Sequence, residues 1–165
     1  MQKNALTALT LLLLSFPIYP VSAGVDKGLE AAEKDDYRTA FQKWRARAQK
    51  GDVKTQATVA VLYHTGQGVS KDYKKAFYWY KKAAEQGNAA SQANLGVMYA
   101  KGTGTKRNMV ESYAWYRLAA EANKDKKVGN ELWGLDAVAS QLSKQEMAKA
   151  KKLAQQYLKK YRAKK

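Results

Sequence analysis

The feature of this sequence that most constrains its fold is an internal repeat with a period of 36 residues. Residues 36–71 align without gaps on residues 72–107, and a third copy begins at residue 108. A period of about 20 to 50 residues is typical of arrays in which every unit is one small structural motif. A unit of this length cannot bury its own apolar face, so it must stack on its neighbours. The repeat therefore predicts an elongated array of similar units.

The first part of each unit has the pattern of an amphipathic α-helix. Asp36, Asp72 and Asn108 open the three copies, and their side chains are of the type that caps the first turn of a helix. After each cap, apolar or small residues recur at spacings of three and four, which places them on one helical face. The matching sets are Tyr37, Ala40, Phe41, Trp44 and Ala48, then Tyr73, Ala76, Phe77, Tyr80 and Ala84, then Met109, Ser112, Tyr113, Tyr116 and Ala120.

A second helix is expected in the first two units. The first helix should end near Gly51 and Gly87, and near Asn123 in the third copy, because these residue types readily adopt the left-handed conformation after a helix. Asp52 and Asn88 follow and can cap the second helix. Each unit is therefore predicted to be a pair of antiparallel helices.

Glycine and alanine mark two further features of the second helix. Ala60 and Gly96 occupy matching positions, and their small size should let the helices of a pair approach closely. The segments Gly66-Gln67-Gly68 and Gly102-Thr103-Gly104 should end the helix and lead to the next unit. A glycine-rich turn can also bind phosphate, but these segments follow helices and lack the Gly-Lys-Ser/Thr sequence of a phosphate loop. We interpret them as structural turns.

The two ends of the array depart from the repeat. Residues 24–35 resemble part of a second helix and are expected to cap the first unit. The third unit, residues 108–123, loses its register at the end of its first helix, and a helix over about residues 130–142 should replace the regular second one. Ser143-x-x-Glu146 is a capping box, which opens a final helix within residues 143–165. Its apolar positions, which should cover the last unit, are Met147, Ala150, Ala154, Tyr157 and Tyr161.

The sequence from Ala76 to Gly104 reads AFYWYKKAAEQGN and then LGVMYAKGTG, and it closely resembles the Sel1-like repeat, a relative of the tetratricopeptide repeat. The resemblance covers about residues 28–123. It implies an all-α fold, a right-handed solenoid of antiparallel helix pairs with a C-terminal capping helix. It also implies that the chain is an adaptor for protein partners and not an enzyme.

One row of the repeat contains the candidate partner-binding residues. Lys43 stands where the next two copies have Trp79 and Trp115, and tryptophan is common at binding hot spots. The alternative is that both tryptophans pack between neighbouring units, as their place in the repeat favours. Lys43 would then mark the open edge near the start of the array.

A strong positive charge predicts anionic partners. The chain has 30 Lys and Arg against 14 Asp and Glu, a formal charge of +16. The final helix is especially basic, and we predict that it can bind an anionic envelope surface such as lipid or an acidic polymer. The alternative is a solvated face without a partner. The candidate residues are Lys149, Lys151, Lys152, Lys159, Lys160 and Arg162.

Residues 1–23 have the pattern of a secretory signal peptide. Lys3 precedes a short apolar run, and Val21-Ser22-Ala23 is a small-x-small cleavage site ahead of Gly24. The alternative is a membrane anchor, but the run is shorter than the roughly 20 apolar residues that span a bilayer. We therefore expect a periplasmic or secreted protein without a transmembrane segment after cleavage. Export argues against nucleic acid as the partner, although the charge alone would allow it.

Catalytic and metal-binding patterns are missing from the sequence. The chain has no cysteine, which excludes disulfides and thiolate chemistry, and His64 is its single histidine. One histidine cannot build a histidine-based metal site, and no motif pairs a serine nucleophile with a base. We interpret His64 as a surface residue and predict neither a cofactor nor a metal. The sequence therefore favours a binding protein.

Overall fold

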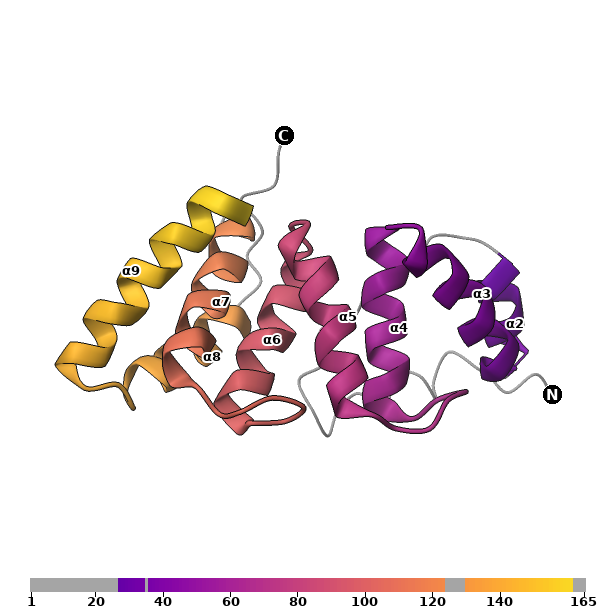
Figure 1. Cartoon of the computed structure of the whole chain (residues 1–165), viewed down its shortest axis with the longest axis horizontal. Coiled ribbons are helices and arrows are strands. Elements are labelled where there is room, and N and C mark those ends of the chain that lie inside the picture. The colour runs from indigo at the N-terminus through magenta and orange to yellow at the C-terminus, as the bar shows by residue number, and fades with distance from the viewer. Residues whose placement is uncertain (1–26, 35, 124–129, 162–165) are drawn as a thin grey trace.

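The computed structural model describes residues 27–34, 36–123 and 130–161. These residues form helices and no strand, which confirms the predicted all-α solenoid (Figure 1). The predicted signal peptide, residues 1–23, and Arg162 lie outside the described residues. The helices are α2 (Lys27–Glu33), α3 (Tyr37–Gln49), α4 (Val53–Thr65), α5 (Tyr73–Glu85), α6 (Ala89–Lys101), α7 (Met109–Ala122), α8 (Asn130–Ala139) and α9 (Lys144–Tyr161).

All five predicted N-caps are confirmed. In each case a side-chain oxygen of the cap accepts a hydrogen bond from the backbone N–H three residues later, which satisfies a donor that the first turn leaves free. The five pairs are Asp36 with Thr39, Asp52 with Thr55, Asp72 with Lys75, Asn88 with Ser91, and Asn108 with Glu111, at 2.8–3.1 Å. Helix starts are therefore set by single polar side chains.

The aspartate caps predict a loss of stability in acid. A side-chain hydrogen bond with Thr39 lowers the pKa of Asp36, and backbone hydrogen bonds from Thr55 and Lys75 lower the pKa values of Asp52 and Asp72. Because these folded-state pKa values are depressed, the stability they add is complete above the unfolded pKa of about 3.9 and is lost as pH falls through the folded pKa. We expect the thermal midpoint, followed by circular dichroism, to fall below about pH 4.

An uncharged cap is the control for this acid effect. Asparagine already caps α6 and α7, so the double variant D52N, D72N should keep both caps without their titration. Its thermal midpoint should change less than that of the unaltered chain between pH 5 and pH 2. An equal fall in both proteins would show that other carboxylates cause the acid loss.

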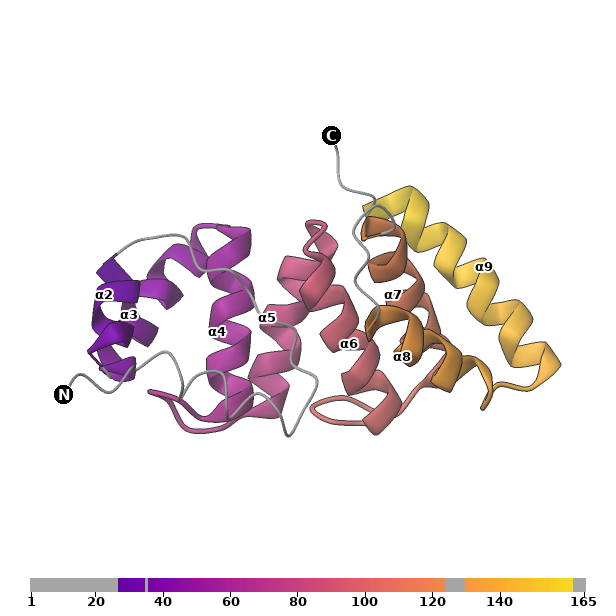
Figure 2. The ribbon, with the colours of Figure 1, turned by 180° about the vertical axis from the view of Figure 1, so that it is seen from behind.

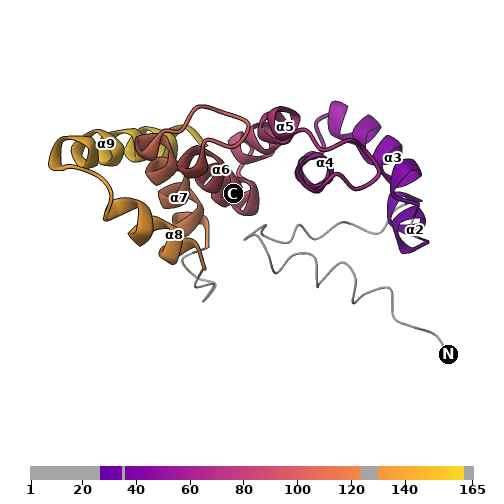
Figure 3. The ribbon, with the colours of Figure 1, turned by 90° about the horizontal axis from the view of Figure 1, so that it is seen from below.

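The helices stack in chain order along a curved array. Seen from below, they follow an arc, with α2 and α8 turned inward at its two ends (Figure 3). Helices α3, α5 and α9 lie on the outer side, and α4, α6 and α8 lie on the inner side (Figures 1 and 3). The reverse view shows the inner side with α4 and α6 at its centre (Figure 2). The array therefore has two different long faces.

Close packing joins the units to each other. A Cβ atom at Gly96 would meet the Tyr116 ring at 2.7 Å, and the Ser112 hydroxyl donates a buried hydrogen bond of 2.7 Å to the Gly96 carbonyl. Tyr116 and Ser112 belong to α7, so this close approach is between α6 and the next unit. The prediction that Gly96 brings together the two helices of its own pair was therefore misplaced.

Buried glutamines form a second repeated contact between helices. The Gln56 side chain donates to the Ala48 carbonyl at 3.1 Å, and Gln92 donates to the Ala84 carbonyl at 3.0 Å. Gln86 extends this contact across units by donating to the Gln56 side-chain oxygen at 2.7 Å. These bonds give the buried amide nitrogens of Gln56 and Gln92 a partner, without which burial would be penalised.

The two glycine-rich segments are structural turns. Gly66 and Gly102 follow α4 and α6 with φ of 82° and 72°, so they end those helices in the left-handed conformation. A Cβ atom at Gly68 would collide with the Tyr37 carbonyl oxygen, and a Cβ atom at Gly104 would collide with that of Tyr73. Each turn thus folds back onto the start of the first helix of its own unit.

The third unit departs from the repeat as expected, with one difference in length. Helix α8 ends at Ala139, three residues before the predicted end, and Asn123 has φ of −108° instead of a left-handed conformation. The capping box is confirmed: the Ser143 N–H donates to Glu146 at 3.0 Å, and the Glu146 N–H donates to the Ser143 hydroxyl at 3.3 Å. Helix α9 then packs on α7, with Ala150 and Ala154 buried.

Matching positions explain why α9 covers α7 and not the earlier units. The outward row of α7 is Val110, Ala114 and Leu118, and its last two members are fully buried or nearly so. The equivalent residues of α5 are Lys74, Tyr78 and Lys82, which are exposed, and those of α3 are Arg38, Gln42 and Ala46, also exposed. Apolar residues at this row therefore create a docking face for α9, whereas α3 and α5 present theirs to solvent.

Candidate interaction surfaces

Trp115, a predicted partner-binding residue, is buried beneath α9. It is 1% exposed, and its ring lies 4.8 Å from that of Tyr157 and 5.6 Å from that of Tyr161, measured between centroids. Aromatic rings at such distances add attraction beyond the area they bury. This placement favours the packing role that the repeat pattern suggested.

The other two residues of the row differ in exposure. Trp79 is 8% exposed and belongs to the core cluster that also contains Trp115, while its ring touches the exposed ring of Tyr78 at 5.2 Å. Lys43 is exposed, at the open end of the row. The structure therefore brings the two tryptophans into one core and leaves Lys43 apart from them.

Tyrosine hydroxyls hold the far end of α9 against two helices. Tyr157 donates to the Glu111 carboxylate at 2.8 Å, and Tyr161 donates to that of Glu85 at 3.4 Å. Burial, followed by the hydrogen bond to Glu111, raises the pKa of Tyr157, so its hydroxyl stays protonated and remains a donor. Through Glu85, α9 reaches the end of α5.

The outward face of α9 is cationic, as the sequence predicted. Lys149, Lys152 and Lys159 are exposed and, at 100° per residue, lie within one strip opposite the buried Ala150 and Ala154. Lys151 and Lys160 are exposed beside this strip. A rise of 1.5 Å per residue makes the strip about 15 Å long.

A second group of cations was not identified from the sequence. On α3 and α5, matching positions carry Arg38 and Lys74, and two turns later Arg45 and Lys81; all four side chains are exposed. Within the described residues no ion pair joins them to a carboxylate. The repeat register itself could have revealed this group, because residues 36 apart must share a face of the array. We call Arg38, Arg45, Lys74, Lys81 and Lys82 the outer basic face.

Tyr78 lies in the middle of this face. It is 52% exposed, and the Lys82 ammonium lies 5.3 Å from the centre of its ring. Exposed tyrosine and arginine side chains are typical of binding surfaces, which distinguishes this face from an inert solvated one. The outer basic face therefore combines charge with an accessible aromatic group.

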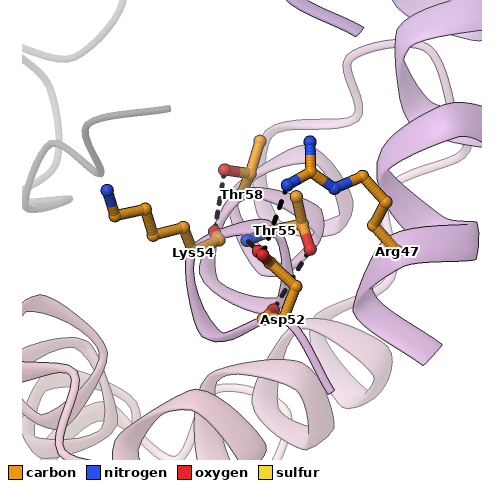
Figure 4. Close-up of polar contacts among 5 residues, drawn as sticks. All are labelled: Arg47, Asp52, Lys54, Thr55 and Thr58. Carbon is orange, nitrogen blue, oxygen red and sulfur yellow. Dashed lines mark hydrogen bonds and ion pairs between the residues drawn. The ribbon is translucent and has the colours of Figure 1, made fainter. Parts of the chain in front are cut away.

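The inner side of the arc carries a row of mostly small side chains. Lys54, Thr58 and Val61 lie along α4, and the row continues on α6 with Ala90 and Val97 at matching positions. In Figure 4 the Lys54 side chain points away from α3, whose Arg47 approaches α4 from the other side to pair with Asp52 at 3.3 Å. We call these five residues the inner face.

His64 is not the surface residue that we expected. It is half-buried, and its ring lies 5.1 Å from that of Tyr73 and 6.2 Å from that of Tyr80. Burial, and then the nearby positive charges of Lys71 and Lys101, lower its pKa, so the imidazole is neutral at pH 7. His64 is therefore a neutral side chain that packs against two aromatic rings of α5.

The described residues contain neither a metal-binding cluster nor a membrane-spanning helix. No three His, Cys, Asp or Glu residues gather there in an arrangement that could bind a metal ion. None of the described helices is both long enough and apolar enough to cross a membrane.

Paired helices stacked in register, without strands in the described residues, define a helical repeat protein of the solenoid class. The family model of the Sel1 repeat matches residues 55–88 and 89–124. Each matched segment starts at the second helix of one unit and includes the first helix of the next, so the family's boundaries are offset from our 36-residue units by half a unit. The chain therefore contains two Sel1 repeats.

Solved structures agree with this assignment. A protective antigen of uropathogenic Escherichia coli strains, described as displaying an SLR fold, is 27% identical with a TM-score of 0.75; the match covers 98% of this chain and 34% of that one. A Sel1 repeat protein from Oxalobacter formigenes is 32% identical with a TM-score of 0.61; the match covers 79% of this chain and 54% of that one. This chain thus spans about a third to a half of these similar proteins. The search of curated proteins found no match.

Proposed function

We propose that this chain is a scaffold that binds a protein or peptide partner along its inner face and catalyses no reaction. The Sel1-repeat fold supports a scaffold, since stacked helix pairs offer long continuous surfaces. The observation that carries the proposal is the inner side of the arc, where α4 and α6 present small side chains such as Val61 and Val97 in repeat register. An extended partner could contact both helices there.

We further propose that the scaffold works in the cell envelope. The signal-like pattern of residues 1–23 supports export, and the test is fractionation combined with N-terminal sequencing of the accumulated protein. A chain that begins at Gly24 outside the cytosol is the expected result. An uncleaved chain in the cytosol would contradict export and favour nucleic acid as the anionic partner.

A single arginine on the inner face should block the partner. Thr58 is half-buried on α4, so T58R would extend a long charged side chain into the space a partner must occupy. We expect the amount of partner that is crosslinked to the chain in envelope extracts to fall at least about tenfold. The reason is that a clash or an unpaired charge costs more than about 1.4 kcal/mol at an interface.

The control carries the same new side chain on the opposite side of the array. Gln42 is exposed on α3, on the outer side, so Q42R should leave recovery of the partner unchanged. Equal losses in T58R and Q42R, or no loss in either, would show that the inner face does not bind the partner.

The second candidate function is binding to an anionic surface or polymer through α9. The strip of Lys149, Lys152 and Lys159 favours it, since within the described residues no ion pair of 4 Å or less joins these lysines to a carboxylate. Lysines close to an anionic surface contribute about 1 kcal/mol each. This function is compatible with the scaffold because α9 and the inner face lie on different sides of the array.

A further inference from the structure

We infer that the outer basic face of α3 and α5 joins the lysine strip of α9 in one composite surface that lies against an anionic lipid bilayer. The inference extends the second candidate function from one helix to the whole outer side of the array. It also gives the molecule an orientation, with the outer side toward the lipid and the inner face turned away from it.

Geometry brings these groups to one side. Helices α3, α5 and α9 lie on the same outer side of the array (Figures 1 and 3). The bond between Tyr161 and Glu85 places the end of α9 at the end of α5, one turn beyond Lys81 and Lys82. The strip of α9 and the outer basic face therefore adjoin each other, although about 70 residues separate them in sequence.

Most of these cations are available to an anionic partner because they form no ion pair within the described residues. Of the exposed lysines on α5, Lys75 pairs with Asp72 at 3.1 Å, whereas Lys74, Lys81 and Lys82 have no ion pair within the described residues. Glu85, the nearest carboxylate along α5, accepts a hydrogen bond from the Tyr161 hydroxyl. The outer side thus carries a net positive charge, which an anionic partner would neutralise.

The shape of this surface favours a bilayer over a single acidic chain. The cations are spread over α3, α5 and α9, which other helices of the array separate from one another, so the charges cover an area instead of following one line. A planar array of headgroups can meet all of them at once. Tyr78 adds a group suited to the membrane interface, because its ring is apolar and its hydroxyl can stay hydrated.

Vesicle sedimentation with two charge-matched double variants tests this inference. The chain expressed from Gly24, which contains every described helix, is mixed with vesicles of phosphatidylcholine containing 30% phosphatidylglycerol in 0.1 M salt. K74E, K81E alters the outer basic face and leaves α9 intact. K54E, K101E makes the same change of net charge on α4 and α6. Circular dichroism checks that both variants remain folded.

We expect the vesicle partition coefficient of the K74E, K81E variant to fall at least about tenfold, since each lysine at an anionic surface changes that coefficient about fivefold. K54E, K101E should lose less than threefold, and Y78A should lose about threefold to fivefold. Binding of the unaltered chain should disappear in 0.5 M salt, where screening shortens the range of charge attraction to about 4 Å.

Three outcomes would overturn the inference, and they are distinguishable. Equal losses in the two double variants would show that only net charge matters. Loss in K152E, K159E with none in K74E, K81E would leave α9 as the binding element and remove α5 from it. Binding of the unaltered chain to soluble polyglutamate, with none to vesicles, would replace the bilayer by an acidic polymer.

Discussion

Replacing Gly104 by alanine should destabilise the fold by about 2–5 kcal/mol. Two effects add at this residue: its φ of 72° costs an L-residue about 1–2 kcal/mol, and the new Cβ would collide with the Tyr73 carbonyl oxygen, a backbone atom that cannot rotate away. The collision would push the turn off the start of α5. Urea unfolding followed by circular dichroism measures the loss.

Gly51 provides the matched control for this prediction. Its φ is 97°, also in the left-handed region, but no atom lies within 4 Å of the Cβ that alanine would add. G51A should therefore show only the conformational cost of about 1–2 kcal/mol. If G104A and G51A lost the same stability, the close approach to Tyr73 would contribute nothing, and the glycine would serve only the turn conformation.

Trp115 should be the most costly side chain to remove. W115A would delete a ring that is 1% exposed and stacks with Tyr157 and Tyr161, and truncations of this kind typically cost about 3–5 kcal/mol. Since these tyrosines hold α9 on α7, the variant should also loosen α9. Trypsin should then cut at the lysines of α9 faster than in the unaltered chain.

The exposed Tyr78 is the control for the tryptophan. Y78A removes a ring that is 52% exposed, so its cost should stay below about 1 kcal/mol and α9 should resist trypsin as before. A loss below 1 kcal/mol in W115A, with α9 equally protected, would show that Trp115 is not needed for packing. The partner-binding interpretation of the tryptophan row would then regain support.

The repeat made most of the secondary structure predictable. Helix starts at Asp36, Asp52, Asp72, Asn88 and Asn108 are all confirmed, because a cap acts through the next three residues and so depends on local sequence alone. The family resemblance and the all-α fold follow from the same short-range pattern. The differences concern the end of α8 and the backbone conformation of Asn123, where the repeat breaks down and no second copy supports the assignment.

The candidate surfaces were predictable only in part. The lysines of α9 were identified because they lie close together in one helix of the sequence, whereas the outer basic face joins residues such as Arg38 and Lys74 from different units. His64 was misjudged for a similar reason: its aromatic neighbours Tyr73 and Tyr80 come from the next helix. Exposure depends on which elements pack together, and a pattern within one helix does not report it.

By itself the sequence determined the period, the helix ends, the capping box of α9 and the excess of positive charge, since each is set by neighbours a few residues away or by composition. Only the tertiary structure decided that Trp115 lies beneath α9, that Gly96 packs against the next unit, and that α9 adjoins α5 through Tyr161 and Glu85, which are 76 residues apart. Contacts over such separations depend on how the stacked units curve, because that curvature selects which helix faces meet and which remain open.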